Sequence, residues 1–366
     1  MSVKEMLESK ILSIINAILP NTTFDRLVIE RRRRINRIEG CYPEAIFLSK
    51  KKSDKKYCIV RYERPTFDLM AAGIQYVFCY HLLSQRGYIP ILDIEYIYSF
   101  RQGQIGEYNI WDECFEQPVS AREAAAQPYV LAAGSLFTYS NDPVICMELN
   151  HDAADHFIHV RKDHFREYYA KANEYVQPIW TIRKDLLDEF DEELWNKVRD
   201  HRVLGVFLRE NFSKDVSYKV EADAEVYSRH PLLPGVKETI EIIKNQLSSW
   251  NYDYIFLSTM YADSVELFRQ EFGGKVICVE RKRINTHDMP GTNFSMGEKE
   301  EYDAFKSNLP YYRNLVRTYM KEIIALSRCD YLLGGASSGM AAALVMNGGK
   351  YQDIYILEDE RKIKRY

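Results

Sequence analysis

The chain has 366 residues, of which 46% are hydrophobic and 28% are charged, and its formal net charge is −4. This length predicts about two domains, and the apolar content is too high for an intrinsically disordered chain. The slightly acidic balance excludes a strongly basic nucleic-acid-binding protein, so we expect no nucleic-acid partner. The seven cysteines are scattered without a Cys-x-x-Cys pair, which predicts reduced thiols and neither a disulfide framework nor a zinc site.

The N-terminus lacks the basic region, apolar core and cleavage site of a signal peptide. The only long charge-free stretch, Ala124–Asn141, is interrupted by Pro128 and Gly134 and does not predict a membrane span. We therefore expect a cytoplasmic protein.

Residues 1–40 predict an N-terminal helical segment. Apolar residues recur near helical spacing from Val3 to Leu19, and the basic run Arg31–Arg34 follows. Two interpretations stay open. The segment is a basic amphipathic surface that touches anionic lipid at the inner face of the membrane, or it packs on the domain or on a second chain in a homodimer.

The first half of the chain alternates short apolar strands with helices, as βαβ units do. The predicted strands are Ile46–Leu48, Cys58–Val60, Ile89–Asp93 and Phe157–Val160, and the predicted helices are Leu69–Gln85, His164–Tyr175 and Ile179–Val198.

The second half continues this alternation. Its predicted strands are Val203–Leu208, Tyr254–Leu257, Val276–Val279, Asp330–Leu333 and Ile354–Leu357, and its predicted helices are Gly235–Ser248, Ala262–Phe272, Pro310–Ser327 and Ser338–Asn347. Such alternation predicts an α/β protein with parallel sheets that helices cover on both faces. We expect two Rossmann-like domains facing a central cleft, the first over residues 41–175 and the second over 201–366, with a bridging helix over 176–200.

Polar side chains follow two of these strands. Arg209 follows the strand Val203–Leu208, and Ser258 and Thr259 follow Tyr254–Leu257. Ligands of such folds bind beyond the carboxyl ends of the strands, and a guanidinium group there could neutralise a departing diphosphate. Two alternatives remain: Arg209 forms a structural salt bridge, and the two hydroxyl residues cap the next helix.

A third strand, Asp330–Leu333, leads into a turn of small residues. Gly334-Gly335 predicts a sharp backbone turn, and Ser337 or Ser338 can cap the helix that follows. The amides and the dipole of that helix terminus favour an anion such as a nucleotide diphosphate. An ordinary capped connection without a ligand is the alternative.

These segments resemble motifs of the fucosyltransferase superfamily, a group of glycosyltransferases with the two-domain GT-B architecture. Gly205-Val-Phe-Leu-Arg-Glu-Asn211 resembles the family's Gly-Val-His-x-Arg-x-x-Asp motif, and Phe256-Leu-Ser-Thr-Met-Tyr261 resembles its Phe-Leu-Ala-Thr-Asp-Asp segment. Ser327-Arg-Cys-Asp330, continued by Ala336-Ser-Ser338, is similar to its serine-pair turn, and His230-Pro-Leu-Leu-Pro234 fits a loop of bacterial members.

The first half adds further similarities, so that the resemblance covers residues 57–358. Arg64–Leu69 and Pro90–Asp93 occupy the places of a helix-opening turn and of a strand that ends in Asp. Asn109-Ile-Trp-Asp-Glu-Cys-Phe-Glu-Gln-Pro118 resembles a segment of bacterial polysaccharide transferases.

The resemblance implies a glycosyltransferase of polysaccharide biosynthesis that is inverting and metal-independent and needs no cofactor. Its donor is a nucleotide sugar, with a GDP-sugar favoured and GDP-fucose as one candidate, and its acceptor is a glycan or a lipid-linked saccharide. Arg209 would stabilise the leaving diphosphate, and Asp68 or Glu116 would be the catalytic base, although a solvated or capping role is the alternative for both carboxylates. The implied donor-binding residues are Asn211, His230, Ser258, Thr259, Ser337, Ser338 and Gly339.

The chain departs from the family pattern at acidic positions. Asn211 replaces an acidic residue, and Met260 and Tyr261 replace paired aspartates. These departures leave the base of the donor open. A non-catalytic nucleotide-sugar or glycan-binding protein on the same fold is the rival function.

Overall fold

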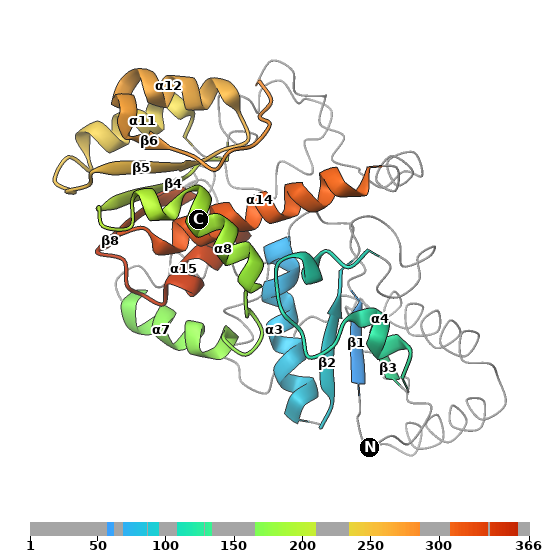
Figure 1. Cartoon of the computed structure of the whole chain (residues 1–366). Coiled ribbons are helices and arrows are strands. Elements are labelled where there is room, and N and C mark those ends of the chain that lie inside the picture. The colour runs from blue at the N-terminus through green and yellow to red at the C-terminus, as the bar shows by residue number, and fades with distance from the viewer. Residues whose placement is uncertain are drawn as a thin grey trace, which may run out of the picture. The chain divides into compact units, whose positions relative to one another are not determined.

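A computed structural model describes residues 57–61, 69–85, 87–94, 108–127, 129–133, 165–209, 234–285, 308–335 and 337–357 of the chain. The chain divides into two compact units, Met1–Asn150 and His151–Tyr366 (Figure 1). Each unit contains a sheet of parallel strands, which confirms the predicted α/β class. The expected cleft and the expected domain boundaries stay predictions.

The sheet of the first unit has the order β2-β1-β3, with β1 (Tyr57–Arg61) in the middle. β1, α3 (Leu69–Gln85) and β2 (Ile89–Asp93) form the predicted βαβ unit. β3 (Tyr129–Ala133) is not predicted from the sequence, although Pro128 and Gly134 bracket its apolar residues.

A segment before β3 covers the outer edge of β2. The side-chain amides of Asn109 and Gln117 bind Leu92 as a neighbouring strand would. Asn109 Nδ2 donates to Leu92 O (2.8 Å), and Leu92 N donates to Gln117 Oε1 (2.7 Å). The segment continues into α4 (Ala121–Ala125), which begins with a Ser120–Glu123 capping box.

The sheet of the second unit has five parallel strands in the order β6-β5-β4-β7-β8 (Figure 1). In chain order the strands are β4 (Val203–Phe207), β5 (Tyr254–Ser258), β6 (Val276–Ile277), β7 (Tyr331–Gly335) and β8 (Asp353–Leu357). This is the 3-2-1-4-5 order of doubly wound nucleotide-binding sheets. The first three strands are added toward one edge of the sheet and the last two toward the other, so the strand order reverses between β4 and β7.

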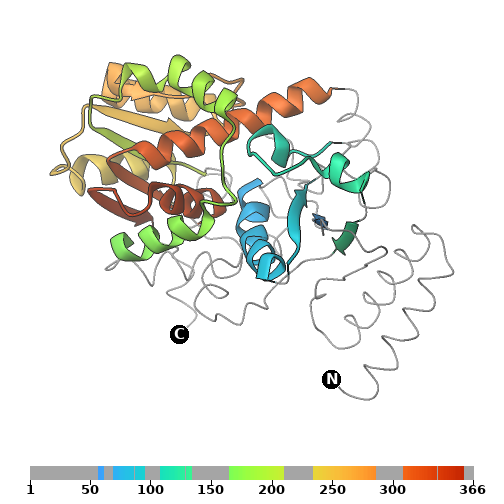
Figure 2. The ribbon, with the colours of Figure 1, turned by 60° about the horizontal axis from the view of Figure 1, so that its bottom comes forward.

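Helices lie on both sides of this sheet (Figure 2). The helices are α7 (Phe165–Val176), α8 (Lys184–Glu193), α11 (Val236–Asn245), α12 (Ala262–Phe272), α14 (Leu309–Arg328) and α15 (Ser338–Asn347). Leu204, Val206 and Leu208 pack in the core that α11 and α12 share with the sheet. The opposite face of the sheet packs against α14 and α15. Gly205 shows how close this packing is, because a Cβ there would lie 3.1 Å from the sulfur of Cys329, the residue that follows α14.

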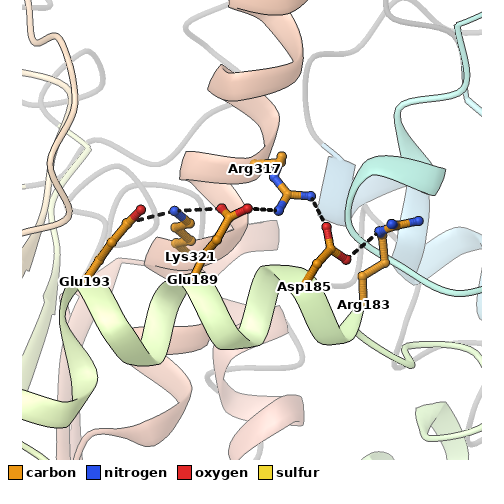
Figure 3. A network of polar contacts seen from close by, with 6 residues as sticks. All are labelled: Arg183, Asp185, Glu189, Glu193, Arg317 and Lys321. Atoms are coloured by element: carbon orange, nitrogen blue, oxygen red, sulfur yellow. Dashed lines mark hydrogen bonds and ion pairs between the residues drawn. The ribbon is translucent and has the colours of Figure 1, made fainter.

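α8 is held on α14 by ion pairs (Figure 3). Arg317 of α14 binds Asp185 (3.1 Å) and Glu189 (2.6 Å), and Lys321 binds Glu189 (3.2 Å) and Glu193 (2.7 Å). The acidic residues recur every four positions, and residues at that spacing share one helix face.

Four predicted elements match the structure residue for residue: Leu69–Gln85, Ile89–Asp93, Ala262–Phe272 and Ser338–Asn347. The predicted helix Ile179–Val198 is too long, because Ile179 and Trp180 instead form a buried turn after α7 and the helix begins only at Lys184. The predicted strands Ile46–Leu48 and Phe157–Val160 and the helical segment over 1–40 lie outside the described residues.

Candidate functional site

Three chain segments leave the second sheet side by side at its carboxyl edge. Phe207 of β4 pairs with Ser258 of β5 on one side and with Gly334 of β7 on the other. Leu208 N still donates to Ser258 O (3.0 Å), so Arg209 follows directly at this edge. The reversal of strand order between β4 and β7 is where doubly wound sheets bind their ligands.

Alternation along the strands assigns side chains to the two faces of the edge. Phe207 and Ser258 both point toward the α14 and α15 side. Ser258 Oγ donates to Glu322 of α14, and a Cβ on Gly339 of α15 would lie 2.8 Å from the Phe207 ring. Arg209 is half-buried and lies two positions beyond Phe207, so alternation predicts the same side for its guanidinium group.

Ser337 is the N-cap of α15, and its Oγ accepts a hydrogen bond from Met340 N (3.2 Å). The predicted glycine turn before it is wrong, because Gly334 and Gly335 belong to β7 and neither has a positive φ. Gly334 is needed for close packing instead. A Cβ there would lie 2.9 Å from Met340 Sδ and 3.2 Å from Phe207 O.

Ser258 and Thr259 stand at the end of β5, and the hydroxyl group of each forms a hydrogen bond inside the protein. Ser258 bonds Glu322 (3.0 Å), and Thr259 Oγ1 accepts from Tyr261 N (3.1 Å), the N-cap residue of α12. Each is only 2% exposed, whereas Met260 between Thr259 and Tyr261 is 47% exposed. Neither residue caps α12, because its N-cap is Tyr261 and no side chain there accepts a capping hydrogen bond; Thr259 binds the backbone amide of Tyr261 itself.

Glu322 is a buried carboxylate that the sequence reasoning missed. Its oxygens accept from Arg281 Nη1 at 3.2 and 3.3 Å, and the side chain lies within a largely apolar stretch of α14. Burial raises the pKa of Glu322, which Arg281 and Ser258 only partly oppose. Lys321-Glu322 between apolar helix residues is the signal that could have identified it.

Arg281 reaches Glu322 from an irregular segment after β6. Phe256 pairs with Ile277 and Tyr261 pairs with Ile284, so the β6 side has two more residues than the β5 side. The Nε atoms of Arg281 and Arg283 are buried and lack a hydrogen-bond partner among the described residues.

The structure places only one of the two predicted catalytic carboxylates. Glu116 is exposed and lies beside Gln117, the residue that covers the edge of β2. Asp68, Asn211 and His230 lie outside the described residues. The edge residues Arg209, Ser258, Thr259, Ser337, Ser338 and Gly339 are all brought to the carboxyl ends of β4, β5 and β7.

Within the described ranges, no group of three or more His, Cys, Asp and Glu residues is arranged to hold a metal ion. In the same ranges, no helix combines the length and the apolar character needed to cross a membrane.

No family model matches the chain, and no curated protein matches it. Among solved structures, the chain is similar to NodZ alpha-1,6-fucosyltransferase co-crystallized with GDP, with 14% identity and a TM-score of 0.42 over 80% of this chain and 92% of that chain. The fucosyltransferase NodZ from Bradyrhizobium gives 14% identity and a TM-score of 0.42 over 80% and 93% of the two chains. POFUT1 in complex with GDP-fucose gives 8% identity and a TM-score of 0.34 over 83% and 74%. Because identities and TM-scores are this low, the assignment of function rests on the residues of the site.

Proposed function

We propose that the chain is a glycosyltransferase whose nucleotide-sugar donor binds at the carboxyl edge of the second sheet. One observation carries this proposal. Arg209 and the Ser337-capped N-terminus of α15 leave the neighbouring strands β4 and β7 at the point where the strand order reverses.

The chemistry of this edge suits a diphosphate leaving group. The first turn of α15 has amide N–H groups without intrahelical acceptors, of which Ser337 binds the one at Met340. The helix dipole and the guanidinium group of Arg209 would both stabilise the negative charge that develops as the bond to the sugar breaks. Arg209 would thereby do in this protein what a metal ion does in metal-dependent transferases.

The proposed reaction is an inverting transfer. An acceptor hydroxyl on a glycan or a lipid-linked saccharide attacks the anomeric carbon, the bond to the diphosphate breaks, and a carboxylate takes the hydroxyl proton. Asp68 and Glu116 remain the candidates for this base. A GDP-sugar is the favoured donor on the family resemblance, and GDP-fucose is one candidate, because Asn211, Met260 and Tyr261 depart from the acidic positions of the family pattern.

The donor is tested by thermal shift of the full chain with GDP, UDP, CMP and dTDP and with their common sugars. We expect one nucleotide series to raise the Tm, since a ligand at about 100 times its Kd adds about 2.7 kcal/mol to the free energy of unfolding. The absence of any shift would contradict the proposed function.

Transfer activity is tested with Arg209→Ala. We expect about a 100-fold loss of kcat, because the variant removes a group that stabilises the leaving charge. Arg199→Ala is the control, since Arg199 is an exposed arginine of the same unit. Nucleotide binding without any product from the unmodified chain would instead identify a nucleotide-sugar-binding protein.

A further inference from the structure

The hydroxyl group of Tyr319 lies against the N-terminal turn of α15, the helix at which the diphosphate is proposed to bind. Gly339 is the second residue of α15, and a Cβ built on it would lie 2.9 Å from Tyr319 Oη and 3.3 Å from Ile323 Cδ1. Tyr319 and Ile323 are four positions apart in α14, so they share the face of that helix that packs on α15. α14 therefore brings a phenolic hydroxyl against the first turn of α15.

The direction of the Cβ position on Gly339 places this hydroxyl at the open end of the helix. Cα–Cβ bonds in a helix tilt toward its N-terminus, so an atom that touches the Cβ of the second residue lies beside the first turn. The amides of this turn have no acceptors within the helix, and Ser337 Oγ binds the one at Met340. Tyr319 Oη thus lies beside the amides that would receive a phosphoryl oxygen.

Buried neighbours hold the half-buried Tyr319 at this place. The ring of Phe207, the last residue of β4, meets the same point, because its Cζ would lie 2.8 Å from a Cβ on Gly339. Phe207 and Ile323 are 7% and 0% exposed, so the packing around the hydroxyl is fixed before a ligand binds. The first turn of α15 holds no acidic side chain, so the helix itself does not neutralise its positive end.

We propose that Tyr319 is a further donor-binding residue, whose phenolic hydroxyl donates a hydrogen bond to a phosphoryl oxygen of the bound diphosphate. The proposal rests on the proposed function and adds a residue of α14 to that site. A hydroxyl donor suits an anion at a helix N-terminus, and hydrogen bonds to charged groups are stronger than those between neutral groups. Because the contact is to phosphate, it acts on every nucleoside diphosphate irrespective of the base.

The test compares the full chain with its Tyr319→Phe variant, which keeps the aromatic ring and loses only the hydroxyl. Titration calorimetry measures the Kd for inorganic pyrophosphate, GDP, UDP and dTDP. We expect each diphosphate that binds the unmodified chain to bind the variant about tenfold more weakly. Equal dissociation constants for the two chains would overturn the proposal. Failure of every diphosphate to bind the unmodified chain would overturn the proposed function as well, so the two failures are distinguishable.

Ile323→Val separates the hydroxyl from the packing around it. Valine lacks the Cδ1 atom that meets the Gly339 position, and the variant leaves Tyr319 itself unchanged. We expect a lower Tm of the unliganded chain, because a methyl group is removed from a buried contact, and dissociation constants within about twofold of the unmodified chain. A loss of affinity equal to that of Tyr319→Phe would overturn the proposal, because loosened packing would then explain both.

Tyr311→Phe is the matched control for the loss of a phenolic hydroxyl from α14. Tyr311 is 47% exposed and lies in the first turn of that helix, eight residues before Tyr319. We expect no change in any of these dissociation constants. A loss of affinity equal to that of Tyr319→Phe would show that the effect does not come from the N-terminus of α15, and it would overturn the proposal.

Discussion

At the scale of single residues, Glu322 has the strongest electrostatic constraint of the site. Its carboxylate is buried at the end of β5 and is shared between Ser258 and Arg281. Burial dominates and raises its pKa above the ordinary value of 4.5. The folded state therefore holds a proton on Glu322 at pH values where the unfolded chain has lost it.

Glu322→Gln tests this constraint. Stability from the retained proton is fully present below pH 4.5 and is lost as the pH rises through the raised pKa of the folded state. We expect the Tm of the unmodified chain, relative to the variant, to fall as the pH is raised above 4.5. Calorimetric scans from acid to neutral pH measure the difference. A difference that grows with pH would contradict the burial argument, and the exposed Glu266→Gln is the control for the substitution itself.

Gly339 is constrained by packing at the N-terminus of α15. A Cβ there would lie 2.8 Å from Phe207 Cζ and 2.9 Å from Tyr319 Oη. Gly339→Ala should lower the free energy of unfolding by about 1–3 kcal/mol, although alanine normally favours a helix.

Gly274→Ala is the control for Gly339→Ala, because no atom lies within 4 Å of the Cβ that it would add. We expect a change within about 0.5 kcal/mol for the control. Equal melting temperatures for the two variants would show that α15 can shift away from Phe207.

At the scale of elements, the contact between α8 and α14 combines a small apolar core with ion pairs. Leu186 and Phe190 are the buried residues of α8, and Arg317 and Lys321 bind its acidic face (Figure 3). Arg317 is 16% exposed, so its pairs are less screened by solvent than pairs on an open surface.

Arg317→Ala should lower the opening free energy of α8 by about 1 kcal/mol. Amide hydrogen exchange of α8 measures this locally, which matters because a chain of two units need not unfold in one step. Lys184→Ala removes an exposed pair with Asp188 on the same helix and should cost less than about 0.5 kcal/mol. Equal effects of the two variants would show that burial adds nothing to the Arg317 pairs.

Most elements could be predicted because their signals are local. Apolar runs of strand length and a helical spacing of apolar residues give the bounds of α3, β2, α12 and α15. β3 was not predicted because it lies in the uncharged stretch Ala124–Asn141, in which apolar and small residues continue past the end of the strand. The sequence did not predict that Asn109 and Gln117 cover the edge of β2, because their side-chain amides there take the place of a strand.

At the scale of the whole molecule, the proposed donor site belongs to the second unit. Its parts come from distant segments, since Leu204 of β4 pairs with Tyr331 of β7. Parallel strands can meet only through long crossover connections, so every residue of the edge depends on the complete sheet. The donor proposal is therefore a statement about residues 151–366 alone.

The sequence by itself determined the α/β class, the type of most of the described elements and the arrival of Arg209, Thr259 and Ser337 at strand ends, because these follow from periodicity and from local capping chemistry. Only the tertiary structure decided which of the neighbouring side chains a ligand can reach. Glu322 of α14, 64 residues further along the chain, accepts a hydrogen bond from the buried Ser258, while Met260 stays exposed. Burial depends on the helix that packs over a strand end, and no local pattern in the strand specifies that helix.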